Sequence, residues 1–268
     1  MQYNFGLRCV RDKGMRKLLF FLTLTFLPLI VRAQITSLKV EVKADGHAWQ
    51  AVIQNHGSSA VMAMRTTFRE QPGIMKDGSI NTAVVVVYDS VTHYGPFPPI
   101  APGGTAERAA QDPSKWTGGV DAAIFSDGHS EGDPQGVNDI YERRRGAYNA
   151  VVKVIPLLDS IATQGANPSE VADTIHGLYQ SLPKDRTITD SERLGLGPVY
   201  LGVENLLRTQ GDIAGLYDPT KYPPQPGIAE VAKVSGIPRE QAHAIVISKK
   251  YQGLKALLEA NLQPATTQ

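Results

Sequence analysis

VDAAIFSDGHSEGDP, residues 120–134, is the stretch in which the hydrophobic pattern of the chain changes. Its first part, Val120 to Phe125, is apolar and β-prone, and the turn-forming pair Asp127-Gly128 follows it. Its last two residues, Asp133-Pro134, are preferred for the N-cap and the first position of a helix. The stretch therefore predicts that β-structure ends near residue 132 and that helical structure begins at residue 133.

Before this junction, apolar and polar residues alternate with the period of two that is typical of strands. Leu38, Val40 and Val42 alternate with charged residues. The unbroken valine run at residues 84–87 predicts a strand that is central or covered on both faces. Six or seven short strands separated by turns are typical of an immunoglobulin-like β-sandwich. We expect strands at residues 38–43, 49–53, 61–68, 82–88, 105–109 and 119–126.

After the junction, apolar residues recur at the spacing of one helical face. Pro156 should kink or divide the first helix, and Asn167 is a cap for the second. Further helices are expected at residues 168–182, 198–209, 228–235 and 238–261. The predicted fold class is therefore segregated α+β. An immunoglobulin-like β-sandwich at residues 34–132 is followed by an α-helical bundle at residues 133–268. Almost no linker separates the two, so they should dock rigidly.

The N-terminal segment predicts export. Basic residues at Met15-Arg16-Lys17 precede an apolar run at residues 18–30, and small residues precede Gln34. This is the layout of a secretory signal peptide, with residues 1–14 as an upstream extension before the start at Met15. The alternative is a membrane anchor. A spanning helix needs about 20 apolar residues, so we favour cleavage after residue 33, no remaining transmembrane span, and a periplasmic or extracellular protein.

The composition excludes several classes of protein. The chain has 268 residues, 27 Lys and Arg, 26 Asp and Glu, and one cysteine. Residues 1–33 hold six of the basic residues, one acidic residue and the cysteine, so the remaining 235 residues carry a net charge of −4. Such a chain can bury a large core, but it lacks the cysteines for a disulfide framework or a thiolate metal cluster. Its charge provides no general case for nucleic-acid binding.

The junction also carries a resemblance. Residues 120–128, continuing through Glu131-Gly132-Asp133 and the basic helix segment Glu142-Arg143-Arg144-Arg145, resemble the corresponding region of uncharacterised bacterial exported proteins. Those proteins have an N-terminal immunoglobulin-like sandwich and a helical C-terminal region. The resemblance covers about a third of the chain. It implies a fold and a compartment, and it implies no activity.

The spacing of residues 228–250 is similar to that of a DNA-binding helix-turn-helix. Gly236 would make the turn, and the second helix would present Arg239, Gln241 and His243 to a groove. The export signal and the few basic residues in this segment favour a structural role instead, because phosphate contacts need positive charge. A DNA-binding regulator is therefore a remote alternative.

Three acidic residues surround the turn at the junction. Asp127, Glu131 and Asp133 partly match the ligand spacing of a calcium loop. His129 is unsuited to such a loop, and Asn138 stands where a bidentate glutamate should be. An Asp-Gly turn followed by a helix N-cap explains the same residues, and we favour that interpretation.

Arginines 143–145 and the neighbouring Tyr141 and Tyr148 could form an anion or lipid-headgroup patch. Arg144 lies near the apolar stripe and could instead form an interdomain salt bridge. A solvated basic face is the interpretation that we favour.

Proline and aromatic residues at positions 94–104 could form a partner-binding loop. Such a segment is more often a stiff crossover between strands.

The chain lacks the common catalytic motifs, including the Gly-x-Ser-x-Gly nucleophile turn and the His-Glu-x-x-His zinc helix. We therefore name no catalytic, cofactor-binding or metal-binding residue and expect no cofactor. The leading hypothesis is an exported, non-catalytic binding or scaffold protein of the bacterial cell envelope. Its partner would be a protein or another envelope component. The alternative is an envelope hydrolase with a site at the interdomain cleft.

Overall fold

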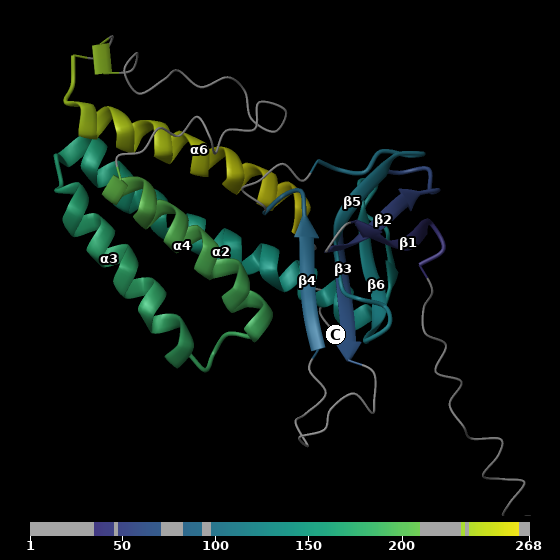
Figure 1. Cartoon of the computed structure of the whole chain (residues 1–268). Coiled ribbons are helices and arrows are strands. Elements are labelled where there is room, and N and C mark those ends of the chain that lie inside the picture. Colours follow the sequence, from purple (N-terminus) through teal and green to yellow (C-terminus); the bar gives the residue numbers. More distant parts are fainter. Residues whose placement is uncertain are drawn as a thin grey trace, which may run out of the picture. The chain divides into compact units, whose positions relative to one another are not determined.

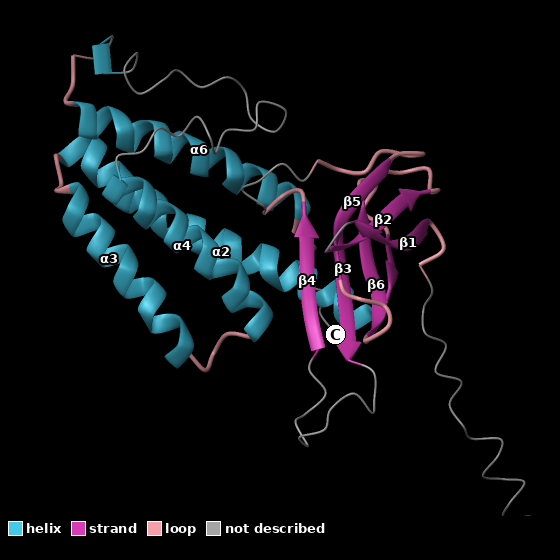
Figure 2. Cartoon of the chain, in the orientation of Figure 1, coloured by secondary structure: helices cyan, strands magenta, loops and turns pink. Residues whose placement is uncertain are grey.

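In the described part of the chain, the strands come first and the helices follow them. The computed structural model describes residues 35–45, 48–70, 83–92, 98–209, 232–233 and 236–262. Within these ranges, strands end at Gly132 and helices begin at Pro134, a division that Figure 2 shows by colour. Residues 33–268 form one compact unit. The fold is therefore α+β, with the junction where the sequence predicts it.

Seven described strands form two antiparallel sheets. One sheet has the order β1-β2-β5 and the other has the order β4-β3-β6-β7. The strands are β1 Leu38–Asp45, β2 Ala48–Asn55, β3 Val61–Glu70, β4 Ala83–Asp89, β5 Thr105–Ala110, β6 Trp116–Phe125 and β7 Ser130–Gly132. The six predicted strands are confirmed, and β7 was not predicted because three residues are too few to show a period.

The two sheets share a buried core. Ile53 of β2, Met64 of β3 and Phe125 of β6 belong to one cluster of buried side chains. The alternation predicted for β1 is confirmed, because Leu38 and Val40 pack against this cluster while the intervening Lys39 is exposed. Alternate residues of β1 therefore face the partner sheet, as the period of two requires.

The position of β4 differs from the prediction. The valine run lies in an edge strand that pairs only with β3 among the described strands, and Figure 1 shows β3 between β4 and β6. Tyr88 packs in the core between the sheets. On the other face, Val87 packs with Ile140 and Tyr141 of the first described helix. Both faces of β4 are apolar because both pack against apolar side chains. An edge strand can be covered on both faces in this way, so the valine run did not require a central position.

Helix α2, Pro134–Gln164, begins where the capping residues predict. The Asp133 side chain accepts hydrogen bonds from the backbone N–H groups of Gln135 and Gly136. Pro156 lies inside this helix and does not divide it. Just before the cap, Gly132 has φ 98°, and a Cβ there would lie 2.2 Å from the carbonyl oxygen of Asp121. Only glycine fits this close approach between β6 and the start of α2.

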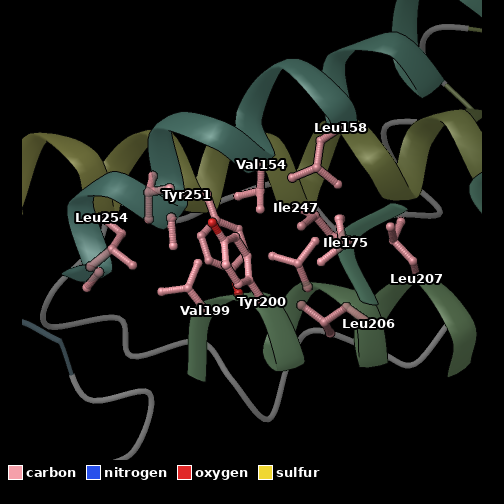
Figure 3. Close-up of a cluster of buried hydrophobic side chains, with 14 of the residues drawn as sticks. Val154, Leu158, Ile175, Val199, Tyr200, Leu206, Leu207, Ile247, Tyr251 and Leu254 are labelled. Atoms are coloured by element: carbon pink, nitrogen blue, oxygen red, sulfur yellow. The ribbon is translucent and has the colours of Figure 1, made fainter. Parts of the chain in front are cut away.

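Three further long helices complete the described fold. They are α3 Pro168–Ser181, α4 Asp190–Thr209 and α6 Arg239–Asn261, and the short 3-10 helix η1 Leu182–Lys184 follows α3. Figure 3 shows Tyr200 of α4 and Tyr251 of α6 among aliphatic side chains such as Val154 and Leu158 of α2. This cluster forms the core of the helical part. The predicted helix at residues 228–235 falls largely outside the described residues.

Helix α4 begins eight residues before the predicted start, and Pro198 lies inside it. Its first turns pack closely on α2 through glycine. A Cβ at Gly195 would lie 2.0 Å from the carbonyl oxygen of Arg143, and a Cβ at Gly146 would lie 2.1 Å from that of Glu192. The backbones touch at this crossing. The early part of α4, residues 190–197, contains Gly195 and Gly197, which disfavour a helix there. Packing against α2 therefore explains why this segment is helical.

Candidate functional site

The acidic residues at the junction are engaged by the protein itself. Asp127 accepts hydrogen bonds from the hydroxyl of Ser59, at 2.6 Å, and from the backbone N–H of His129, at 3.2 Å. Its Oδ1 also lies 2.5 Å from Nδ1 of His129. Glu131 accepts the backbone N–H groups of Thr36 and Ser37. Each carboxylate therefore stabilises a turn or a strand end.

These contacts hold the carboxylates in their charged forms. Hydrogen bonds from Ser59 and His129 lower the pKa of Asp127 to about 2. Burial raises the pKa of Glu131, but hydrogen bonds from Ser37 and Thr36 outweigh this effect, so its pKa is lowered. In the described part of the chain, no group of three or more candidate ligands could hold a metal ion. The hydrogen bonds of Asp127 and Asp133 support the turn and N-cap interpretation, and the calcium loop stays an untested alternative.

A substitution at Asp133 separates these two interpretations by experiment. Asp133→Ala should lower the free energy of unfolding by about 1 kcal/mol, because the helix loses its cap. Asp133→Asn should retain most of the stability, since asparagine caps helices equally well. Urea unfolding with and without about 10 mM calcium measures both effects, a concentration above the dissociation constants of weak extracellular calcium sites. A calcium-dependent rise in stability that Asp133→Asn abolishes would restore the metal site.

The arginine run is divided between buried and half-buried positions. Arg144 is 1% exposed, and two of its nitrogens, Nε and Nη2, lie 2.9 Å from the carboxylate oxygens of Asp89 at the end of β4. Its third nitrogen donates to the carbonyl oxygen of Asn261 at the end of α6. The solvated-face interpretation is therefore wrong for Arg144, and the salt-bridge alternative is confirmed. The sequence places Arg144 near the apolar stripe of the helix, but it does not show that Asp89 is its partner.

A second charged cluster joins β3, β6 and α2. Arg65 lies 3.3 Å from Asp121 of β6 and 3.4 Å from Asp139 of α2. Burial raises the pKa of Asp121, although Thr67 and Arg65 oppose this effect. Burial likewise lowers the pKa of Arg143. The charges of this cluster are largely compensated within the protein. The cluster therefore links β3 and β6 to the start of α2.

The helix-turn-helix segment is described only in its second part. His243, which that hypothesis directs into a groove, is 4% exposed in α6. Arg239 is exposed and Gln241 is half-buried. Helix α6 packs in the core of the helical part through Ile247, Tyr251 and other side chains. A buried His243 contradicts the predicted DNA-reading surface, and residues 210–231 lie outside the described ranges.

Lys250 of α6 provides a pH-dependent test of this packing. The residue is 5% exposed, and burial lowers its pKa from 10.5 to about 8. Between these two pH values the unfolded chain binds more protons than the folded chain, so stability should rise with pH across this window. Below pH 8 the buried charge costs roughly 3 kcal/mol, at about 1.4 kcal/mol per pKa unit.

Lys250→Met should therefore remove the rise in stability between about pH 8 and pH 10.5. Lys255, whose side chain is 36% exposed and paired with Glu259, is the matched control. An unchanged pH profile in Lys250→Met would mean that Lys250 is solvated in the folded protein.

The structure describes only residues 98–104 of the proline-rich segment, because residues 93–97 lie outside the described ranges. Within the segment, Ile100 forms an antiparallel bridge with Val61, so it continues the sheet as a crossover should. A shallow hollow of about 210 Å³, part of it open to solvent, is lined by Val61, Met64, Tyr88, Ile100 and Arg108, among others. The Arg108 guanidinium stands 5.3 Å from the ring centre of Tyr88.

A water-sized molecule could enter only about 10 Å³ of this hollow, whereas ligand sites range from about 300 to 1,000 Å³. Its lining residues all precede Gly132. It therefore does not correspond to the cleft between the two halves of the chain that the hydrolase alternative requires.

The edges of the two sheets differ in a way that singles out β4. Strand β1 carries three exposed charged residues, β5 carries Glu107 and Arg108, and β7 has only three residues. Charge and short length are the features that protect an edge from pairing with other chains. In β4 the only charged residue is Asp89, which is 2% exposed and paired with Arg144. Its register with β3 contains no bulge.

We take this edge of β4, residues Ala83–Asp89, as the candidate site. Val85 near its middle is 39% exposed, so a large apolar side chain faces solvent there. Sequence analysis missed the site because it placed the valine run in the interior. The absence of charge over residues 83–88, compared with the charged residues of β1 and β5, is the signal that could have found it.

The chain matches no family model, no curated protein and no solved structure. The resemblance of residues 120–133 to exported bacterial proteins therefore stays a prediction. None of the helices in the described ranges has the length and apolar character that a membrane span requires.

Proposed function

We propose that the protein is an exported, non-catalytic binding or scaffold protein of the bacterial cell envelope. Export is inferred from the signal-peptide pattern at residues 15–34. Binding is inferred from the edge of β4, which is uncharged and partly exposed. This edge is the single observation that carries the proposal, because a strand edge binds through its backbone and needs no catalytic group.

We also propose that the two sheets form an immunoglobulin-like sandwich. In that fold, strands A, B and E share one sheet, while C′, C, F and G share the other. The observed orders β1-β2-β5 and β4-β3-β6-β7 correspond to A-B-E and C′-C-F-G when the strands are lettered along the chain. On this assignment β4 is strand C′.

A stable support behind the edge favours a binding role. The Asp89 carboxylate at the end of β4 is held by Arg144 of α2, and Arg144 also holds the end of α6. Three elements therefore meet at one buried guanidinium. A binding edge held in this way loses little conformational entropy when it pairs.

The test uses the full chain recovered from fractionated cells. A variant with a photo-crosslinking amino acid at position 85 should yield one discrete adduct in the envelope or culture fraction. The same residue placed at Lys39, on the charged edge of β1, should not. The mass of the recovered chain should correspond to a start at Gln34. An uncleaved chain in the cytoplasm would contradict export, and substrate turnover lost on replacing one residue would replace this proposal with the hydrolase.

A further inference from the structure

We infer that the edge of β4 binds an extended segment of a partner polypeptide as an added antiparallel or parallel strand. This segment is uncharged over the length of β4 and carries a carboxylate at the end that lies beside Ala83. The inference rests on the proposed binding role and specifies the chemistry of the partner.

The backbone of β4 has the groups that such pairing needs. Ser90 donates its N–H to the carbonyl oxygen of Met62, at 2.8 Å, so this pair is hydrogen-bonded across β3 and β4. Hydrogen-bonded pairs alternate along an antiparallel ladder. In the register of the two strands, Tyr88 and Val86 therefore bond to β3, while Val85 and Val87 direct their N–H and C=O groups away from it.

The side chains of β4 determine which strand it accepts. An added strand would lie beside Val85 and Val87, on a face that includes the apolar residues Ile140 and Tyr141. A charged side chain there would lose its hydration without gaining a partner. β-branched or aromatic side chains would instead bury the exposed part of Val85, and such cross-strand pairs stabilise sheets.

A cation lies on β3, one strand behind one end of the edge. Arg69 of β3 is opposite Ala83, the first residue of β4, and it is exposed. An acidic residue at the neighbouring end of the added strand would form an ion pair with it at the rim. Charges at a rim mainly affect the rate of association and the register, and so Arg69 should select the orientation of the bound segment.

The probe for this inference is a short synthetic peptide of alternating threonine and valine, with glutamate at both ends and a fluorescent label. Fluorescence anisotropy should show saturable binding to the full chain. The same peptide with N-methyl groups on both its valines and its threonines cannot pair through either of its edges, so it should bind at least about tenfold more weakly, a factor equivalent to 1.4 kcal/mol.

Two substitutions at one position test the site on the protein. Val85→Pro removes an N–H that points away from β3, and proline is tolerated at such edge positions. It should weaken peptide binding at least about tenfold. Val85→Thr keeps both the N–H and the β-branched shape, so its affinity should stay within about twofold. Circular dichroism should show that both variants retain the folded structure, and Arg69→Glu should weaken binding of the glutamate peptide but not of a lysine-ended one.

Three results would overturn the inference. The first is an absence of peptide binding up to about 1 mM, which would mean a binding free energy weaker than roughly 4 kcal/mol. The second is equal peptide binding by Val85→Pro and Val85→Thr. The third is a dimer, seen in sedimentation, that Val85→Pro dissociates. The last result would mean that a second copy of the chain occupies the edge. A discrete envelope adduct from position 85 together with failure of the peptide would leave the proposed function standing and remove only this partner chemistry.

Discussion

Replacing Arg144 by alanine should lower the free energy of unfolding by about 3–5 kcal/mol. The substitution leaves the carboxylate of Asp89, which is 2% exposed, without its guanidinium partner. An uncompensated buried charge is among the most destabilising changes in a protein interior. The end of α6 would also lose the hydrogen bond to the carbonyl oxygen of Asn261. Urea unfolding followed by circular dichroism measures the loss.

Two companion variants show whether burial causes this effect. Lys255 forms an ion pair of similar length, 2.8 Å, with Glu259 on the surface of α6. Lys255→Ala should leave the urea midpoint almost unchanged, because exposed pairs contribute little. The double variant Asp89→Leu with Arg144→Met should recover much of the stability, since it removes both charges. A loss below about 1 kcal/mol in Arg144→Ala would contradict a buried ion pair.

The second large effect is expected where α2 and α4 cross. Gly195→Ala should destabilise the protein by about 3 kcal/mol, at the upper end of the range for overpacking. The added Cβ would lie 2.0 Å from the carbonyl oxygen of Arg143. The oxygen belongs to the backbone and the Cβ is fixed to the Cα, so neither atom can rotate away. The two helices would have to separate. Thermal unfolding of the purified chain gives the size of the effect.

Gly197 is the matched control, because it lies in the same helix two residues further along. A Cβ there would have only the Tyr179 ring as a neighbour, at 3.6 Å. Gly197→Ala should therefore stabilise α4 by up to about 1 kcal/mol, the difference in helix propensity between the two residues. Similar effects of both substitutions would show that the crossing is looser than the structure indicates.

The candidate site could be predicted only in part from the sequence. Residues 83–88 were recognised as a strand from their β-branched run, which is a local property. Whether that strand is central or at an edge depends on which strands pair with it, and pairing partners are far apart in sequence. The turn and the helix cap were recognised because Asp127 accepts the N–H of His129 and Asp133 accepts that of Gly136, both within three residues. The contact of Asp127 with Ser59, 68 residues away, depends on the fold.

The sequence by itself determined the order of the elements and the place of the junction. Capping at Asp133, the Asp127-Gly128 turn and the alternation in β1 are local effects, so short stretches of sequence show them. Only the tertiary structure decided the burial of Arg144, whose partner Asp89 is 55 residues away, and the early start of α4, which depends on contact between Gly195 and α2. Burial and close packing depend on neighbours that the fold brings together, and a local pattern contains no information about them.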